Sequence, residues 1–139
     1  MRLANDEIRR RIAGARVGYL ATVNADQRPH LVPITFALCG TAIVTVTDAK
    51  PKSSSILQRH RNVASQPRTC VLVDHYDDDW TKLWWARADG LAKLLTDAEA
   101  EYAIGITALV DKYPQYAAVP PYGLMIWIDA ISWSGWSYS

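Results

Sequence analysis

The feature that most constrains this sequence is a succession of β-rich runs that lacks the strict strand–helix alternation of a doubly wound α/β fold. Valine, isoleucine, threonine and aromatic residues dominate six runs, which are predicted to be strands: 17–23, 30–36, 41–47, 68–75, 82–95 and 124–129, the last able to continue over 132–138. A polar turn separates the first two runs and a break at Cys39-Gly40 precedes the third, which predicts an antiparallel meander. Gly90 predicts a bend in the long fifth strand.

Three helical patterns lie among these strands. Apolar residues recur at helical spacing after the polar pair 5–6, either residue of which can cap the first helix. The serines at 53–55 open a second helix, and Thr96 and Glu99 have the spacing of a capping box ahead of a third, which runs to about position 112. The predicted fold class is therefore α+β but mainly β, a small barrel or strongly bent sheet with a few helices.

A length of 139 residues predicts a single domain over residues 1–139. Because 50% of the residues are hydrophobic, this domain can bury a core. Lys and Arg number 15 against 14 Asp and Glu, so bulk electrostatics does not favour nucleic acid as a partner. No run approaches the ~18 apolar residues of a membrane span, and no signal peptide is evident, which predicts a cytoplasmic protein without a membrane partner. Six Trp and seven Tyr suit ligand pockets and subunit interfaces as well as a core.

One segment breaks the charge balance. No acidic residue lies between positions 49 and 73, and Lys50 and Lys52 stand directly before Ser53 and Ser54 at the predicted helix start. Unpaired backbone N–H groups and the helix dipole favour an anion at such a place. The segment is therefore either a phosphate site or a capped helix start with solvated lysines.

Side chains typical of metal or nucleophilic catalysis form no recognisable pattern. His30, His60 and His75 lack ligand spacing, and Cys39 and Cys70 are too few for a zinc site and are predicted to be buried thiols. We therefore expect no metal and assign no catalytic residue. If the protein is an enzyme, a bound cofactor should carry the reaction.

Several motifs are specific enough to indicate a family. They are Leu-Ala-Thr at 20–22, Pro-His-x-Val-Pro at 29–33, Lys-Pro-Lys at 50–52, Asp-x-Tyr-x-x-x-Trp-x-x-x-Trp-Trp at 74–85, Ala-Arg-Ala-Asp-Gly at 86–90 and Ser-Gly-Trp at 134–136. Together they resemble the pyridoxamine 5′-phosphate oxidase-like split β-barrel superfamily, and within it the actinobacterial branch that uses the deazaflavin coenzyme F-420. The resemblance departs from the family pattern at Ser53 and Ser54, where relatives often have arginine or threonine, and at Gln27, where many have glycine.

This resemblance implies a homodimer of six-stranded split β-barrels, of the FMN-binding split barrel type, with the cofactor in a groove between subunits. It implies that Lys50 and Lys52, with the serine-led helix start, hold the cofactor phosphate. The remaining implied cofactor-binding residues are Val32, Pro33, Thr35, Thr45, Val46 and Thr47 along the ring, with Trp84, Trp85 or Trp136 closing the pocket, from the partner chain where needed.

The resulting hypothesis is an F-420-dependent oxidoreductase that passes a hydride from reduced deazaflavin to an electron-poor small molecule. Arg59, Arg61 and Arg68 are candidates to extend a positive track toward the acidic tail of this cofactor. Two alternatives remain open at this stage: an FMN-dependent oxidoreductase of the same fold, and a non-catalytic protein that carries the cofactor.

Overall fold

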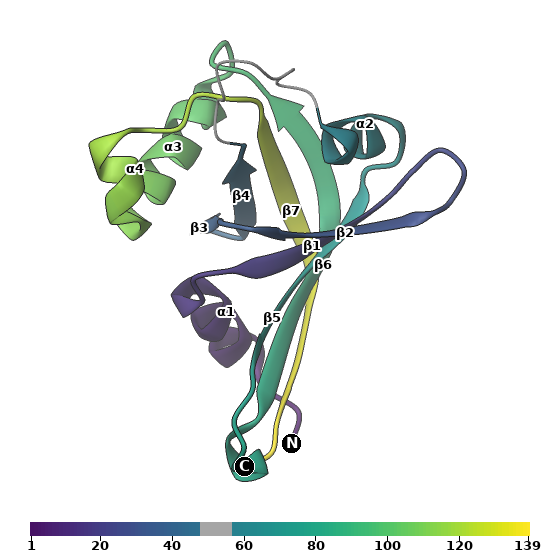
Figure 1. Cartoon of the computed structure of the whole chain (residues 1–139), viewed down its shortest axis with the longest axis vertical. Helices are drawn as coiled ribbons and strands as arrows, with labels where there is room; N and C mark the ends of the chain where they lie inside the picture. Colours follow the sequence, from purple (N-terminus) through teal and green to yellow (C-terminus); the bar gives the residue numbers. More distant parts are fainter. Residues whose placement is uncertain (48–56) are drawn as a thin grey trace.

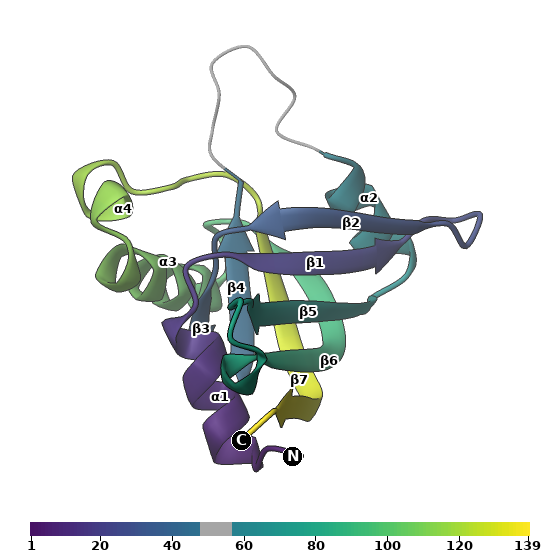
Figure 2. The same cartoon turned by 60° about the horizontal axis from the view of Figure 1, so that its bottom comes forward.

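The computed structural model describes residues 1–47 and 57–139, and its centre is one seven-stranded antiparallel sheet of order β2-β1-β5-β6-β7-β4-β3. The strands are β1 (Gly18–Val23), β2 (Pro29–Ile34), β3 (Ala37–Cys39), β4 (Ala42–Val46), β5 (Arg68–His75), β6 (Trp84–Leu95) and β7 (Met125–Ser137). The sheet curls strongly, so that β1 and β2 run across the direction of β4 and β7 (Figure 2). This arrangement is the predicted split-barrel fold.

Four α-helices and one short 3₁₀ helix complete the described chain. They are α1 (Asn5–Gly14), α2 (Gln58–Ser65), η1 (Trp80–Lys82), α3 (Ala100–Lys112) and α4 (Pro114–Ala118). Helix α1 packs on β6 and β7, α2 on β1 and β6, and α3 on β3, β4 and α4. Helices α3 and α4 therefore lie on one side of β4 and α2 on the other (Figure 1).

The apolar residues form two adjoining cores. The larger core lies inside the curl, where Ile8 and Ile12 of α1 meet Leu20, Phe36 and Val71. The smaller core lies under α3 and is lined by alternate residues of β4 and by residues of α3, α4 and β7. Strand β4 is buried at all five positions, because one of its faces contributes to each core.

The position of β4 corrects the predicted meander. The third β-rich run pairs with β3 and β7 and not with β2, which lies at the edge of the sheet. In this place between β3 and β7, one face of β4 packs into the larger core and the other into the core under α3, which explains its continuous apolar run. The short strand β3 is the seventh strand, which the sequence pattern did not reveal. It joins β4 through Gly40, whose φ of 60° suits glycine.

The predicted bend in the fifth strand is confirmed. The register between β6 and β7 shifts between Asp89 and Gly90. A Cβ atom on Gly90 would lie 2.3 Å from the carbonyl oxygen of Asp129, so only glycine fits at this close approach. Strand β7 runs through to Ser137, as the continuation over 132–138 predicted.

Both predicted helix caps at the N-terminal ends of α1 and α2 are wrong. Helix α1 begins at Asn5 itself after an extended Ala4, and no side chain caps it. Helix α2 begins at Gln58, and its N-cap is Leu57 and not a serine. Here the His60 ring supplies the local acceptor, since its Nδ1 accepts a hydrogen bond of 2.9 Å from the Leu57 N–H.

Two further observations bear on the sequence-based expectations. Cys39 and Cys70 are free thiols, and both are half-buried where full burial was expected. Within residues 1–47 and 57–139, no helix combines the length and the apolar character needed to cross a membrane.

Candidate functional site

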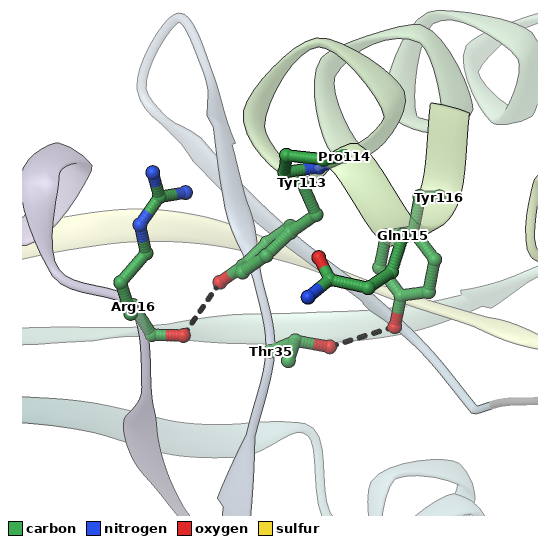
Figure 3. A pocket seen from close by; sticks show the side chains of 6 residues that line it. All are labelled: Arg16, Thr35, Tyr113, Pro114, Gln115 and Tyr116. Atoms are coloured by element: carbon green, nitrogen blue, oxygen red, sulfur yellow. Dashed lines mark hydrogen bonds between the residues drawn. The ribbon is translucent and has the colours of Figure 1, made fainter. Parts of the chain in front are cut away.

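A cavity of about 600 Å³ opens where the connection between α1 and β1, the end of β2 and the start of α4 meet. Its lining consists of Arg16, Thr35, Tyr113, Pro114, Gln115 and Tyr116 (Figure 3). Pro114 is the first residue of α4, a position that suits proline because no intrahelical N–H is needed there. The helix start thus presents two tyrosines and a glutamine to one space whose volume suits a small ligand.

Tyr113 forms a fixed wall of this cavity. Its hydroxyl donates to the carbonyl oxygen of Arg16 at 2.8 Å and accepts from the Phe36 N–H at 3.1 Å. Its ring packs edge-on against Tyr116, with 5.5 Å between ring centroids. Burial raises the pKa of the Tyr113 phenol, so this group stays protonated at neutral pH.

Thr35, a residue of the predicted cofactor site, lines this cavity, and the buried Thr45, another of the predicted residues, bonds to it without lining the cavity. The Thr45 hydroxyl donates to the carbonyl oxygen of Thr35 at 2.7 Å, and the Thr35 hydroxyl lies 2.8 Å from the Tyr116 hydroxyl. Figure 3 shows the Gln115 amide between the two tyrosine rings, on the side of Thr35. A row of hydroxyl and amide groups therefore follows one edge of the cavity.

Thr47, directly after β4, contacts His60 of α2. Thr47 lies 3.5 Å from Nε2 of His60, a ring that is buried to 1% exposure. Burial and the nearby Arg59 charge lower the pKa of His60 to about 4, so the imidazole is neutral near pH 7. Burial also lowers the pKa of Arg59, and its Nε is buried without a hydrogen-bond partner in the described chain.

The other predicted ring-binding residues have different surroundings. Pro33 is exposed, and Val32 is half-buried against the larger core. Val46 is 4% exposed and belongs to the core under α3, which leaves its side chain little surface for a ligand. The predicted phosphate residues Lys50, Lys52, Ser53 and Ser54 lie outside the described residues.

Trp85 and Trp136 stand opposite each other on β6 and β7. Trp85 also stands opposite Asp74 of β5, the strand next to β1. Neither tryptophan lines the cavity.

Sequence reasoning missed Tyr113, Gln115 and Tyr116. The signal that was available is the proline at 114 directly after the predicted helix, together with two nearby tyrosines. A proline at the first position starts a new helix, and rings with polar tips suit a pocket. The pairing with Thr35 was not visible, because it joins residues 81 positions apart.

The described residues offer orientation and hydrogen bonding, and they lack a recognisable pair of acid–base groups. In residues 1–47 and 57–139, no three His, Cys, Asp or Glu side chains gather in a way that could hold a metal ion. The hydroxyls of Thr35 and Tyr116 can accept or donate, and the Tyr113 ring excludes water. This arrangement is suited to holding a bound group whose own chemistry does the reaction.

The curled antiparallel sheet agrees with the comparisons with known proteins. Residues 4–137 match the family described as pyridoxamine 5′-phosphate oxidase. The chain belongs to this family.

Solved structures show the same fold at low identity. A conserved hypothetical protein of Mycobacterium tuberculosis is 23% identical, with a TM-score of 0.76 over 98% of this chain and 86% of that one. An FAD-binding protein of Mesorhizobium loti is 19% identical, with a TM-score of 0.72 over 97% and 95%. A heme-binding protein of Mycobacterium smegmatis is 20% identical, with a TM-score of 0.69 over 95% and 57%.

Proposed function

We propose that this protein is a cofactor-dependent oxidoreductase that binds coenzyme F-420 and passes a hydride to an electron-poor small molecule. The observation that carries the proposal is a tyrosine-lined cavity in a chain of the pyridoxamine 5′-phosphate oxidase family. The predicted cofactor-binding residue Thr35 lines this cavity, and the predicted residue Thr45 bonds to Thr35. The motifs at 50–52 and 74–85, which resemble the deazaflavin branch, favour F-420 over a flavin.

Arg59 in the first turn of α2 suits a phosphate-bearing cofactor. The Arg59 Nε is a buried donor without a hydrogen-bond partner in the described chain, and burial lowers the pKa of its guanidinium. An anion next to this group would satisfy the donor and offset the cost of burying the charge. Arg61 and Arg68 are exposed, so of the three arginines expected to extend the positive track, Arg59 is the one suited to a buried contact.

A reduced deazaflavin supplies a two-electron hydride when it is bound, and the side chains need only orient two partners and exclude water. Thr35, Gln115 and Tyr116 can hydrogen-bond the polar edge of a planar ring. The buried face of Tyr113 keeps solvent away from one side of the cavity. No described side chain has to act as a nucleophile in this scheme.

Two alternative functions are compatible with the same site. An FMN- or FAD-dependent oxidoreductase would use the same cavity, and a solved neighbour described as FAD-binding favours this alternative. A non-catalytic carrier would bind the cofactor without transferring a hydride, and a solved neighbour described as a heme-binding protein keeps binding without catalysis among the candidates. The fold does not choose between these functions, because function depends on the site.

A competition titration tests the proposal. Purified apoprotein is titrated with F-420 and with FMN, and a quinone or enone is then added to the complex with reduced F-420. We expect tighter binding of F-420 and oxidation of its reduced form by the acceptor. Preferential binding of FMN with turnover on FMN alone would assign the flavin function, and binding of F-420 without turnover of any acceptor would assign the carrier.

Variants locate the phosphate site. Lys50→Ala and Lys52→Ala should each weaken binding by about 1.5–3 kcal/mol if these lysines are buried with the phosphate. Arg59→Gln should weaken binding as well, whereas the exposed neighbour Arg61→Gln is the matched control. An unchanged dissociation constant in all three test variants would contradict the assignment.

A further inference from the structure

A second cleft of about 560 Å³ lies on the other side of the connection between α1 and β1. It is formed by the last turn of α1, by this connection, and by the adjoining ends of β5 and β6. Three arginines line it, at positions 10, 11 and 16, with Asp74 as the single acidic lining residue. The volume is that of a small-molecule site, and the proposed cofactor function does not use this cleft.

Arg11 of α1 is held by two neighbouring side chains. The Arg11 Nε donates to Oε2 of Glu7 at 2.6 Å, and the Arg11 guanidinium lies over the Trp84 ring at 5.0 Å from its centroid. The Arg11 side chain is only 21% exposed. Two contacts therefore hold this guanidinium in place before any ligand arrives.

These contacts leave donors of the arginines free. Both terminal nitrogens of Arg11 make no hydrogen bond with a described residue, and neither is buried. Arg10 is held by Glu7 through Nε and Nη2, and Arg16 by the carbonyl oxygen of Lys112 through Nη1 at 2.7 Å. In the described structure, Nη1 of Arg10 and the Nε and Nη2 of Arg16 likewise donate to no protein atom. Guanidinium groups fixed at one edge and free at the other suit the oxygens of a carboxylate or phosphate.

A flat surface stands beside these donors. The His75 and Trp84 rings are stacked, with centroids 6.2 Å apart and planes inclined by 16°. The His75 side chain is 47% exposed, so part of its ring faces the cleft. Such a surface favours a planar ligand over a flexible one.

We propose that this cleft binds a small organic anion, an oxyanion group carried on a flat ring, with Arg11 as the principal contact and the His75–Trp84 pair against the ring. Glu7 has a positioning role, because it orients Arg10 and Arg11 without lining the cleft. The Asp74 carboxylate repels a bound anion, so removing its charge should strengthen anion binding.

The test uses 1-naphthoate as the probe and 1-naphthamide as its neutral counterpart, with ¹⁵N-labelled full-length protein observed by NMR. The indole N–H signal of Trp84 is assigned by comparison with Trp84→Phe. We expect naphthoate to shift this signal in a saturable way, and naphthamide to bind at least tenfold more weakly, because it lacks the charge that the guanidinium groups recognise. An equal affinity for the two probes, or no shift at Trp84, would overturn the proposal.

Three variants complete the test. Arg11→Gln should weaken naphthoate binding at least tenfold, and Asp74→Asn should strengthen it about two- to fivefold by removing a repulsive charge. Arg28→Gln is the matched control, because Arg28 is an exposed arginine in the turn between β1 and β2 and the variant changes the net charge equally. Because Asp74 is exposed, its variant keeps the proposal testable even where Arg11→Gln is unstable. Unchanged affinity in both test variants, or an Arg28→Gln effect as large as that of Arg11→Gln, would overturn the assignment.

Discussion

At the scale of single residues, His60 couples stability to acid pH. It is buried at 1% exposure and its pKa is lowered to about 4, mainly by burial, against 6.5 for an ordinary histidine. Between these values the unfolded chain binds more protons than the folded one, so stability falls as the pH drops from 6.5 toward 4. Urea unfolding at pH 7 and pH 5 measures this loss.

The matched variants for His60 are His60→Gln and His60→Ala. Glutamine does not titrate and can accept the Leu57 N–H as in a capping box, so it should retain most of the stability at pH 7 and reduce the loss at pH 5. Alanine leaves that N–H without its acceptor and should cost about 1–3 kcal/mol at both pH values. An equal acid loss in wild type and His60→Gln would assign it to other groups.

Lys112 couples stability to pH in the alkaline range, with the same sign as His60. Its Nζ is buried without a hydrogen-bond partner in the described chain and lies 3.8 Å from the Phe36 ring centroid. Burial, and to a lesser degree Arg16, lowers the pKa of Lys112 from 10.5 to about 8. Above pH 8 the folded chain therefore binds fewer protons than the unfolded one, and stability rises with pH up to about 10.5.

Replacing Lys112 by methionine should remove this rise, because a similar apolar chain without a charge fills the same space. Urea unfolding at pH 7 and pH 9.5 checks the expectation, and we expect Lys112→Met to be at least as stable as wild type at pH 7. Lys93→Met is the control, since Lys93 forms an exposed ion pair with Glu101. A rise that persists unchanged in Lys112→Met would contradict the assignment.

At the scale of elements, the bulge in β6 depends on a single glycine. A Cβ on Gly90 would clash with backbone at 2.3 Å, whereas a Cβ on Gly14, at the end of α1, would meet nothing within 4 Å. Gly90→Ala should therefore destabilise the protein by roughly 1–3 kcal/mol or more, as overpacking does. Gly14→Ala should stabilise it by about 0.5–1 kcal/mol through helix propensity. Denaturant midpoints measure both, and a neutral Gly90→Ala would refute the close approach.

The elements also explain how far sequence reasoning reached. Strands with strong β-branched patterns, such as β1 and β5, were found with nearly their observed bounds, because their patterns are local. The pairing of β4 with β7 was not predicted, since it joins segments that lie far apart in the sequence. The cap of α2 failed for a different reason: the imidazole of His60 acts where a serine was expected.

The candidate site was likewise predicted only in part from the sequence. Thr35 and Thr45 were named from the family motifs, and the structure brings them together through one hydrogen bond. Tyr116 of α4 was missed because its contact with Thr35 arises only when the end of β2 and α4 come together. Local sequence signals identify strands and turns, while a cavity is a property of their assembly.

At the scale of the whole molecule, one face of the sheet carries a run of apolar side chains. The register places Tyr19, Leu31 and Leu72 on the same face of β1, β2 and β5, and Trp85 and Trp136 continue it on β6 and β7. Leu31 is 66% exposed, and Tyr19 and Trp136 are each 37% exposed. Arg87, opposite Leu72, and Asp74, opposite Trp85, lie on the same face between these apolar side chains. Exposed apolar side chains interspersed with charges in this way suit an interface between subunits.

We therefore predict a homodimer formed through this face, in which Trp85 and Trp136 of one subunit approach the cavity of the other. Sedimentation equilibrium at micromolar concentration should show a dimer, and Leu31→Asp should shift it to monomer, because a buried unpaired charge is costly. Ile104→Asp is the control, since Ile104 is 59% exposed on α3, away from this face. If the two tryptophans reach across the interface, the Leu31→Asp monomer should also bind cofactor more weakly than the dimer does. A wild-type monomer would contradict the predicted dimer. A dimer that tolerates Leu31→Asp and is lost in Ile104→Asp would place the interface elsewhere and leave the tryptophans without a role at the cavity.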